Sequence, residues 1–404
     1  MRNNILYIGQ AKASTIADKY GTPLYVYNED TIRMKYDSLI ENITYPKTEI
    51  YYACKANYNL TILRMLRDLG AGIDAVSPEE VYLALKAGFS HNKILFTGNN
   101  VTDEEMKFVK NHNVLINIDS LSQLKRYGGM YPDSEISIRI NPNVGAGHHA
   151  HVITGGPESK FGIYYTRTDE IKRIASDYNL KIIGIHMHIG SGILDPEPFL
   201  LGIRSLLSTA KEFKGLEFID IGGGLGIPYK PKERQLDLKK FGQKLGEIFD
   251  SWSENYGKVA LRLELGRYLV AESGVLLTRV NTVKKTPYRT FIGVDTGFNH
   301  LIRPILYGAY HKIIAVNKVS HEKTQKVDVC GNICESGDLF ARDRIMPEIE
   351  EGDLLAITNV GAYGFSMSSN YNFRPRPSEV LVSDGKMRLI RRRETIEDML
   401  RCFR

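Results

Sequence analysis

Short apolar runs alternate with helix-like segments between residues 49 and 265, and this alternation constrains the fold more than any other feature. Segment 77–87, between two of the runs, opens with the helix-start signals of a capping serine, a proline and two glutamates. Strands that alternate with helices indicate a parallel sheet. Eight such units predict a TIM-like (β/α)8 barrel, which typically takes about 250 residues. The eight runs are 49–55, 72–76, 94–98, 115–119, 136–141, 182–189, 217–222 and 260–265.

The rest of the chain predicts a second, all-β domain. Beyond about residue 275 the strand-like runs follow one another without clear helices between them. This spacing is typical of a β-barrel or sandwich, and the extended segment 22–27 could join it. We therefore expect an α/β barrel over residues 28–275 and a β domain made of residues 1–27 and 276–404. The β runs are 275–280, 290–295, 311–316, 324–330, 353–358 and 378–382.

Composition and charge exclude several classes of protein. The 404 residues are 43% hydrophobic and 25% charged, as in ordinary globular proteins. The net charge of +6 is spread along the chain, so we expect no nucleic-acid partner. No run approaches the about 18 apolar residues of a membrane span, and the first residues lack a signal peptide's apolar core. Four scattered cysteines indicate a reducing, cytoplasmic setting rather than a disulfide scaffold.

Reactive and polar residues follow the ends of the predicted barrel strands. The carboxyl ends of barrel strands face one common pocket, so these residues are expected to converge there. Lys55 by itself could simply extend its amine to solvent, but the reactive residues at the other strand ends favour a catalytic role. Strand alternation along 49–55 would turn Lys55 toward the pocket and Cys54 toward the helices. In chain order the strand-end residues are Lys55, Asp74, Asn117, Asp119, Arg139, His186, His188, Gly222, Gly223, Gly224, Glu264 and Arg267.

The loops after the last two barrel strands predict a phosphate site. Barrels often bind phosphate there through backbone N–H groups. The run Gly222 to Gly224 permits close approach of the backbone to an anion, and Arg267 adds a forked cationic donor. A tight turn without a ligand is the alternative for the glycine run.

Two histidines on one predicted strand, His186 and His188, leave two interpretations open. Their side chains share a face, so they could form a metal pair or one could stack on a flat ligand. His148, His149 and His151 offer a rival metal cluster. Because neither set has the usual spacing of a zinc site, we expect no metal.

Together these groups describe pyridoxal 5′-phosphate. A lysine can carry its aldehyde as an imine, the glycine loop can hold its phosphate, and His188 can lie against its ring. Glu264 can keep the pyridine nitrogen protonated, which makes the ring a strong electron sink. The alternative for Glu264 is an ion pair with Arg262 or Arg267.

Several ordered motifs resemble the fold-type III pyridoxal-phosphate-dependent decarboxylases, from about residue 20 to 395. The resemblance is greatest to the diaminopimelate decarboxylase family. Here Leu265 replaces the family's usual proline, and Gly331-Asn332-Ile333 precedes Cys334 where a proline is more usual. Neither change removes a charged or reactive group. The motifs are Tyr52-Ala-Cys-Lys55-Ala-Asn57, His186-x-His188-Ile-Gly-Ser191, Gly222-Gly-Gly224, Glu264-x-Gly-Arg267, Cys334-Glu-Ser-Gly-Asp338, Gly361-Ala-Tyr363 and Ser369-Asn-Tyr371-Asn.

The resemblance implies a role for each matched residue. Lys55, His188 and Cys334 would be catalytic, with Cys334 as the proton donor. It also implies a homodimer in which the Cys334 segment enters the neighbouring subunit's site. Cofactor contacts would come from Lys55, His188, Ser191, Gly222, Gly223, Gly224, Glu264, Gly266, Arg267 and Tyr363. Substrate contacts would come from Arg267, Arg303, Tyr307, Glu335 and Tyr363.

The implied reaction is decarboxylation of meso-2,6-diaminopimelate to L-lysine and carbon dioxide, the last step of lysine biosynthesis. By the resemblance, Arg303 and Tyr307 grip the distal carboxylate, which favours a dicarboxylic diamino acid. The alternatives are a decarboxylase of D-lysine or D-ornithine, a racemase on the same scaffold, or a non-catalytic cofactor carrier. The Cys334 motif and the glutamate at the ring nitrogen disfavour the racemase, and the β domain disfavours the carrier.

Overall fold

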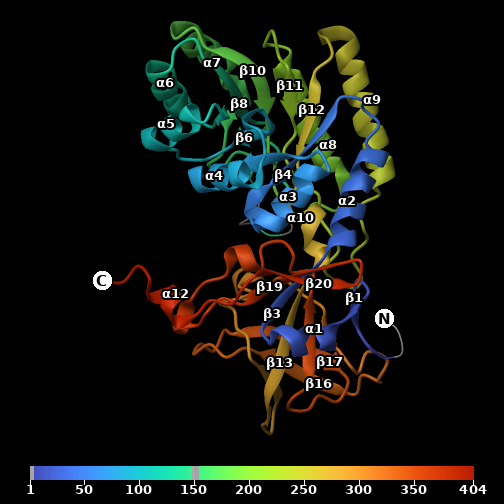
Figure 1. Ribbon diagram of the computed structural model, residues 1–404. Coiled ribbons are helices and arrows are strands. Elements are labelled where there is room, and N and C mark those ends of the chain that lie inside the picture. The colour runs from blue at the N-terminus through green and yellow to red at the C-terminus, as the bar shows by residue number, and fades with distance from the viewer. Residues whose placement is uncertain (1–3, 148, 150–153) are drawn as a thin grey trace. The chain divides into compact units, whose positions relative to one another are not determined.

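A computed structural model describes residues 4–147, 149 and 154–404 (Figure 1). The chain divides into two compact units. The barrel unit comprises residues 36–227 and 234–269, and the β unit comprises residues 1–35, 228–233 and 270–404. The domain bounds expected at residues 27/28 and 275/276 stay a prediction.

Eight parallel strands close into a barrel, which confirms the predicted fold class. The strand order is β10-β11-β12-β4-β5-β6-β7-β8, and β8 pairs with β10 to complete the ring. A short further strand, β9 (Ile163–Tyr164), pairs with β8. The barrel strands are β4 (Thr48–Ala53), β5 (Gly72–Ala75), β6 (Ile94–Phe96), β7 (Leu115–Ile118), β8 (Glu135–Asn141), β10 (Lys181–His186), β11 (Phe218–Asp220) and β12 (Ala260–Glu264).

Helices connect these strands and lie around the outside of the barrel (Figure 1). Their ends follow local sequence signals. The Ser77 side chain accepts from the Glu80 N–H at the start of α4, and Gly88 ends that helix with a left-handed φ of 93°. Thr102 and Glu105 form a capping box on α5. The helices are α3 (Leu60–Asp68), α4 (Pro78–Ala87), α5 (Asp103–Asn111), α6 (Leu121–Met130), α7 (Thr168–Asp177), α8 (Pro196–Ala210) and α9 (Leu238–Tyr256), with α2 (Glu29–Asn42) before β4 and α10 (Arg267–Val270) after β12.

The β unit is built around a mixed sheet of order β17-β16-β14-β13-β3-β19-β20, with β18 pairing β13 and β15. The extended N-terminal segment joins it as predicted, because β3 (Leu24–Asn28) lies between β13 and β19. Figure 1 shows this blue strand among the orange and red strands of the C-terminal half. The other strands are β13 (Gly274–Lys285), β14 (Thr290–Val294), β15 (Ile313–Ala315), β16 (Gln325–Cys330), β17 (Leu339–Met346), β18 (Leu354–Thr358), β19 (Ser378–Ser383) and β20 (Lys386–Arg391).

The remaining elements of the β unit are small. A hairpin of β1 (Tyr7–Ile8) and β2 (Ala11–Lys12) precedes α1 (Ala13–Tyr20), and α11 (Arg303–Tyr307) and α12 (Ile396–Leu400) are short helices. Apolar side chains of α1, β3, β13 and β19 share one core cluster. Among the described residues, no helix is both long and apolar enough to cross a membrane.

Candidate active site

Lys55 reaches a buried carboxylate at the carboxyl end of the barrel. Its Nζ lies 2.5 Å from Oδ2 of Asp74, which is fully buried near the end of β5. Oδ1 of Asp74 accepts a hydrogen bond from the Thr97 hydroxyl, just beyond β6. Three neighbouring strand ends therefore bring the amine and its acceptor together.

The backbone at Lys55 differs from the expected strand. β4 ends at Ala53, and Lys55 lies in the 3-10 turn Cys54–Ala56. Two-residue alternation therefore does not orient Lys55, and that part of the prediction is wrong. The pairing of Ala53 with Asp74 across β4 and β5 explains the proximity instead, because the turn begins one residue after this pair.

Glu264 and His186 form a buried hydrogen-bonded pair. Nε2 of His186 lies 2.9 Å from Oε2 of Glu264, and the side chains are 1% and 4% exposed. Burial, followed by the charge of Asp74, raises the pKa of Glu264 well above its usual value. Burial lowers the pKa of His186 to about 4. Arg262, the expected alternative partner of Glu264, instead donates from Nε to Oε2 of Glu49 at 2.8 Å.

The glycine run after β11 packs too tightly for any side chain. A Cβ at Gly223 would lie 1.9 Å from the carbonyl oxygen of Glu264, and one at Gly222 would lie 2.2 Å from that of Met187. Gly222 also has a left-handed φ of 69°. Glycine is thus required at both positions, whether or not the loop holds an anion.

His188 is held as a neutral ring. Its Nδ1 accepts the N–H of Gly223 at 3.0 Å, and burial lowers its pKa well below the usual value. The proton of the neutral ring must therefore lie on Nε2. An uncharged, fixed imidazole suits stacking against a flat ring.

Arg267, which follows β12, meets Ser191, which follows β10, although β11 lies between these strands. Nε and Nη2 of Arg267 donate to Oγ of Ser191 at 3.3 and 3.1 Å. Gly266 precedes Arg267, and a Cβ there would lie 2.8 Å from Cβ of Ala56, beside Lys55. A forked cation next to a hydroxyl suits a phosphate, because both groups can donate to its oxygens.

The Cys334 segment lies on a loop of the β unit that a buried aspartate organises. Asp338 accepts the N–H groups of Ile333 and Phe298 at 2.8 and 2.7 Å. Cys334 and Glu335 are exposed at the tip, and Glu335 accepts the Tyr371 hydroxyl at 2.7 Å. The motif Cys-Glu-Ser-Gly-Asp thus combines two exposed functional groups with the aspartate that fixes their loop.

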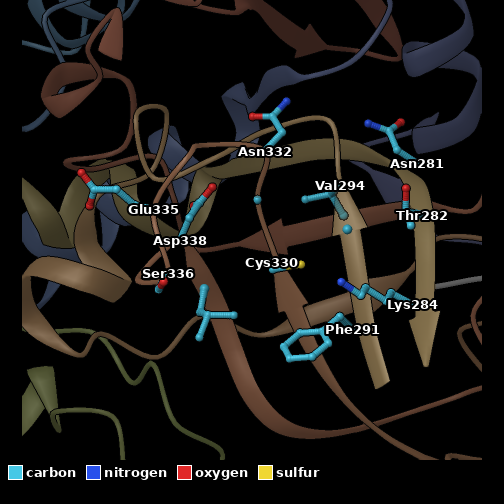
Figure 2. Close-up of a pocket in the computed structure, with 13 residues that line it drawn as sticks. Asn281, Thr282, Lys284, Phe291, Val294, Cys330, Asn332, Glu335, Ser336 and Asp338 are labelled. Atoms are coloured by element: carbon cyan, nitrogen blue, oxygen red, sulfur yellow. The ribbon is translucent and has the colours of Figure 1, made fainter. Parts of the chain in front are cut away.

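A cavity of about 510 Å³ borders this loop (Figure 2). In Figure 2, Glu335 and Asp338 lie on one side of Cys330, and Lys284 and Phe291 lie on the other. Burial raises the pKa of the Cys330 thiol, so this cysteine is less easily ionised than a free one.

The β unit also holds Arg303 in a defined orientation. Arg303 is 1% exposed, and its guanidinium carbon lies 4.6 Å from the centre of the Tyr229 ring. Its Nη1 lies 3.0 Å from Nε2 of His311, whose Nδ1 lies 2.8 Å from the Thr358 carbonyl oxygen. The carbonyl only accepts, so Nδ1 carries the ring proton and Nε2 accepts from Arg303. Tyr307 lies at the other end of the same short helix, α11.

The predicted site residues thus fall into two groups. The barrel unit brings together Lys55, His188, Ser191, Gly222, Gly223, Gly224, Glu264, Gly266 and Arg267, and the β unit carries Arg303, Tyr307, Cys334, Glu335 and Tyr363. Their individual roles stay predictions. His148 and His151, from the rival metal cluster, lie outside the described residues.

Asp220, a fully buried acid on β11, was not predicted from the sequence. It is the register partner of His186, and its Oδ1 accepts the N–H of Gly222 at 2.8 Å. Burial, followed by the charge of Glu264, raises the pKa of Asp220 to about 8. An acid inside an otherwise apolar strand was the signal that could have revealed it. Tyr229 and His311 beside Arg303 were also missed.

Comparison with known proteins shows to which enzyme family the chain belongs. Residues 29–271 match the pyridoxal-dependent decarboxylases, pyridoxal binding domain. A diaminopimelate decarboxylase of Methanothermobacter thermautotrophicus is 53% identical over 98% of this chain and 95% of its own length. The chain belongs to the diaminopimelate decarboxylase family. The family member of Aquifex aeolicus is 39% identical over 98% of this chain and 95% of its own length.

A solved structure from this family has the same fold. Diaminopimelate decarboxylase of Methanocaldococcus jannaschii in complex with L-lysine matches with a TM-score of 0.92 and 37% identity, covering 99% of this chain and 96% of the other. The family's cofactor is pyridoxal phosphate, and the barrel residues fit it. Oε1 of the buried Glu264 has no hydrogen-bond partner among the described residues. An acceptor left in this state fits a site where the ring nitrogen of a cofactor donates to it.

Proposed function

We propose that this member of the diaminopimelate decarboxylase family removes the carboxylate at the D-configured centre of meso-2,6-diaminopimelate. The products are L-lysine and carbon dioxide, so the enzyme is a lyase that completes lysine biosynthesis. The observation that carries the proposal is the 53% identity to one such decarboxylase along 98% of the chain.

Lys55 is the residue that attaches the cofactor. When bound, pyridoxal phosphate supplies an electron sink for the electron pair of the broken carbon–carboxylate bond. An ammonium group is no nucleophile, so Lys55 must first lose a proton, and Oδ2 of Asp74 at 2.5 Å is positioned to accept it. His188 would lie against the cofactor ring, and Glu264 would accept a hydrogen bond from its protonated pyridine nitrogen. The phosphate would be held by Gly222, Gly223, Gly224, Ser191, Gly266 and Arg267.

The β unit supplies the groups that select and protonate the substrate. Arg303, with Tyr307, binds the distal carboxylate, because a guanidinium matches a carboxylate with two parallel hydrogen bonds. Cys334 returns a proton to the carbon that has lost carbon dioxide. Glu335 binds the distal amine of the substrate. Arg267 and Tyr363 complete the contacts with substrate and cofactor.

The enzyme acts as a cytoplasmic homodimer. The Cys334 segment of each subunit enters the active site of the other subunit. The exposed positions of Cys334 and Glu335 on one tip support this arrangement, because both side chains are available to a partner. Mixing Lys55→Ala and Cys334→Ala proteins tests it. Random exchange of subunits would restore about one quarter of the wild-type activity, because one site in each mixed dimer keeps both residues. No recovery after verified exchange would contradict shared sites.

Release of carbon dioxide from a panel of amino acids tests the reaction. The protein, loaded with pyridoxal phosphate, is incubated with meso-diaminopimelate, D-lysine, D-ornithine and L-lysine. The proposal predicts release from meso-diaminopimelate in far greater amount than from the others. Release from D-lysine or D-ornithine instead would establish the alternative decarboxylase, and racemisation without carbon dioxide would exclude a decarboxylase.

A further inference from the structure

Three side chains at the carboxyl ends of neighbouring strands form a buried polar cluster, the His186–Asp220–Glu264 cluster. β10, β11 and β12 lie side by side, and His186 is the register partner of Asp220. Each side chain brings a nitrogen or oxygen atom to within 4.8 Å of the others, and all three are buried. The role proposed above for Glu264 leaves His186 and Asp220 without a function.

The hydrogen bond between His186 and Glu264 has one direction when Glu264 is ionised. The imidazole of His186 is neutral near pH 7, so it carries a single N–H. A carboxylate only accepts, and Nε2 of His186 lies 2.9 Å from Oε2 of Glu264. The ring proton must therefore lie on Nε2, where it is donated to Oε2.

This hydrogen bond occupies one carboxylate oxygen of Glu264 and leaves the second oxygen available to another donor. Oε1 of Glu264 has no hydrogen-bond partner among the described residues. Leaving a buried acceptor unsatisfied costs about 1–3 kcal/mol, so Oε1 is prepared for an incoming donor. The terminal torsion of a glutamate is broad, and a carboxylate without the histidine could rotate about it.

We propose that His186 is a positioning residue that acts through Glu264. By holding Oε2, it turns Oε1 toward the nitrogen of the bound pyridine ring. The inference rests on the proposed function, since Glu264 must be the partner of that nitrogen. In this role His186 needs no contact of its own with cofactor or substrate.

Asp220 limits the negative charge of the cluster when Glu264 is ionised. Its Oδ1 accepts the N–H of Gly222, while its Oδ2 has no hydrogen-bond partner among the described residues. In a fully buried position beside a second carboxylate, the protonated form is favoured at neutral pH. The other charged groups that act on Glu264 are Asp74, Lys55, Arg139 and Arg262. Burial also raises the pKa of Glu264, so this carboxyl ionises only beside a positive charge such as a protonated ring nitrogen, and a neutral Asp220 then adds no second negative charge next to it.

The ¹⁵N chemical shift of the pyridine nitrogen in the loaded enzyme tests the inference. Enzyme carrying ¹⁵N-labelled cofactor is compared as wild type, His186→Leu and His186→Gln. We expect His186→Leu to move the shift toward that of an unprotonated pyridine. It should also lower kcat roughly 10-fold with KM within about 2-fold, because a misplaced charge acts on the chemical step. His186→Gln should recover much of both, because its amide can donate near the former Nε2.

A matched control and two further measurements keep the test decisive. His91→Leu, an exposed histidine before β6, should leave the pyridine shift unchanged. A wild-type pyridine shift in His186→Leu would overturn the inference. So would histidine ¹⁵N shifts in the loaded wild-type enzyme that place the His186 proton on Nδ1, a result that does not depend on how a variant folds. Glu264→Gln distinguishes failure of the proposed function from failure of this inference. If Glu264→Gln leaves the pyridine shift unchanged, the role proposed for Glu264 is wrong. If the shift changes in Glu264→Gln but not in His186→Leu, only the role of His186 is excluded.

Discussion

Nζ of Lys55 lies 2.5 Å from Oδ2 of Asp74, and parallel pairing of β4 with β5 creates this contact. Asp74 is fully buried, so its carboxylate is stabilised by such partners rather than by water. The same carboxylate that fixes the lysine can accept its proton. Under the proposed function, this ion pair would both hold Lys55 in place and assist attachment of the cofactor.

Asp74→Asn should slow covalent attachment of the cofactor. An amide is a much poorer proton acceptor than a carboxylate, and the charge-assisted hydrogen bond to Lys55 is lost. We expect the rate of attachment to fall roughly 100-fold, at the lower end of the range for a positioned general base. Absorbance of the lysine-bound cofactor after mixing measures this rate. Asp18→Asn, an exposed carboxylate on α1, should load at the wild-type rate, and equal rates for both variants would contradict this role of Asp74.

Gly223→Ala should destabilise the protein and prevent cofactor binding. The new Cβ would lie 1.9 Å from the carbonyl oxygen of Glu264, and backbone cannot move aside as a flexible side chain can. We expect a loss of about 3 kcal/mol or more in the free energy of unfolding. Gly129→Ala is the control, because the nearest atom to its Cβ is 3.9 Å away and the residue lies in helix α6. There alanine should be neutral or add about 0.5–1 kcal/mol. Similar unfolding midpoints in denaturant for both variants would refute the packing argument.

Asp220→Asn should stabilise the unloaded protein, by an amount that grows with pH. The folded-state pKa of Asp220 is raised to about 8, so its contribution to stability is complete below its ordinary pKa of 3.8 and is lost as pH rises through about 8. Asparagine does not ionise. The variant should therefore gain on the wild type between pH 4 and 8, by roughly 2 kcal/mol at pH 7 after allowance for relaxation. Thermal midpoints at pH 5, 7 and 9 measure the gain, and a gain independent of pH would contradict a protonated Asp220.

Arg303→Met should weaken the enzyme's action on substrates that carry a distal carboxylate much more than on substrates that lack one. Methionine keeps much of the buried side-chain volume but cannot bind a carboxylate. We expect KM for meso-diaminopimelate to rise about 100-fold, equivalent to the roughly 2–3 kcal/mol of a charge-assisted hydrogen bond. Any slow turnover of D-lysine should change much less. Arg204→Met, an exposed position on α8, should leave both substrates unaffected. Equal losses for the two substrates would mean that Arg303 is structural.

The barrel could be predicted because local sequence patterns mark each of its strands. Apolar runs, helix caps and intervening glycines are properties of neighbouring residues, and each of the eight predicted runs overlaps a barrel strand. β17 was missed because Arg342-Asp343-Arg344 interrupts its apolar pattern. The turn at Lys55 was missed because the apolar run continues past the end of the strand at Ala53.

The contacts within the site depend on register, which no single strand encodes. The contact of His186 with Glu264 requires β11 to lie between β10 and β12, with His186 opposite Asp220. Likewise, Arg303 meets Tyr229 from a segment more than 70 residues away. The sequence therefore predicted which residue types gather at the strand ends, but not which of them bind one another.

Identification of the lysine that carries the cofactor is the decisive test of the proposed active site. Reduction of the loaded enzyme with borohydride makes the attachment permanent, and mass spectrometry of its peptides then locates the added pyridoxyl group. We expect one modified peptide from the wild-type enzyme, carrying the group on Lys55, and none from Lys55→Ala. A pyridoxyl group on another lysine of the wild-type enzyme, with Lys55 unmodified, would contradict this assignment.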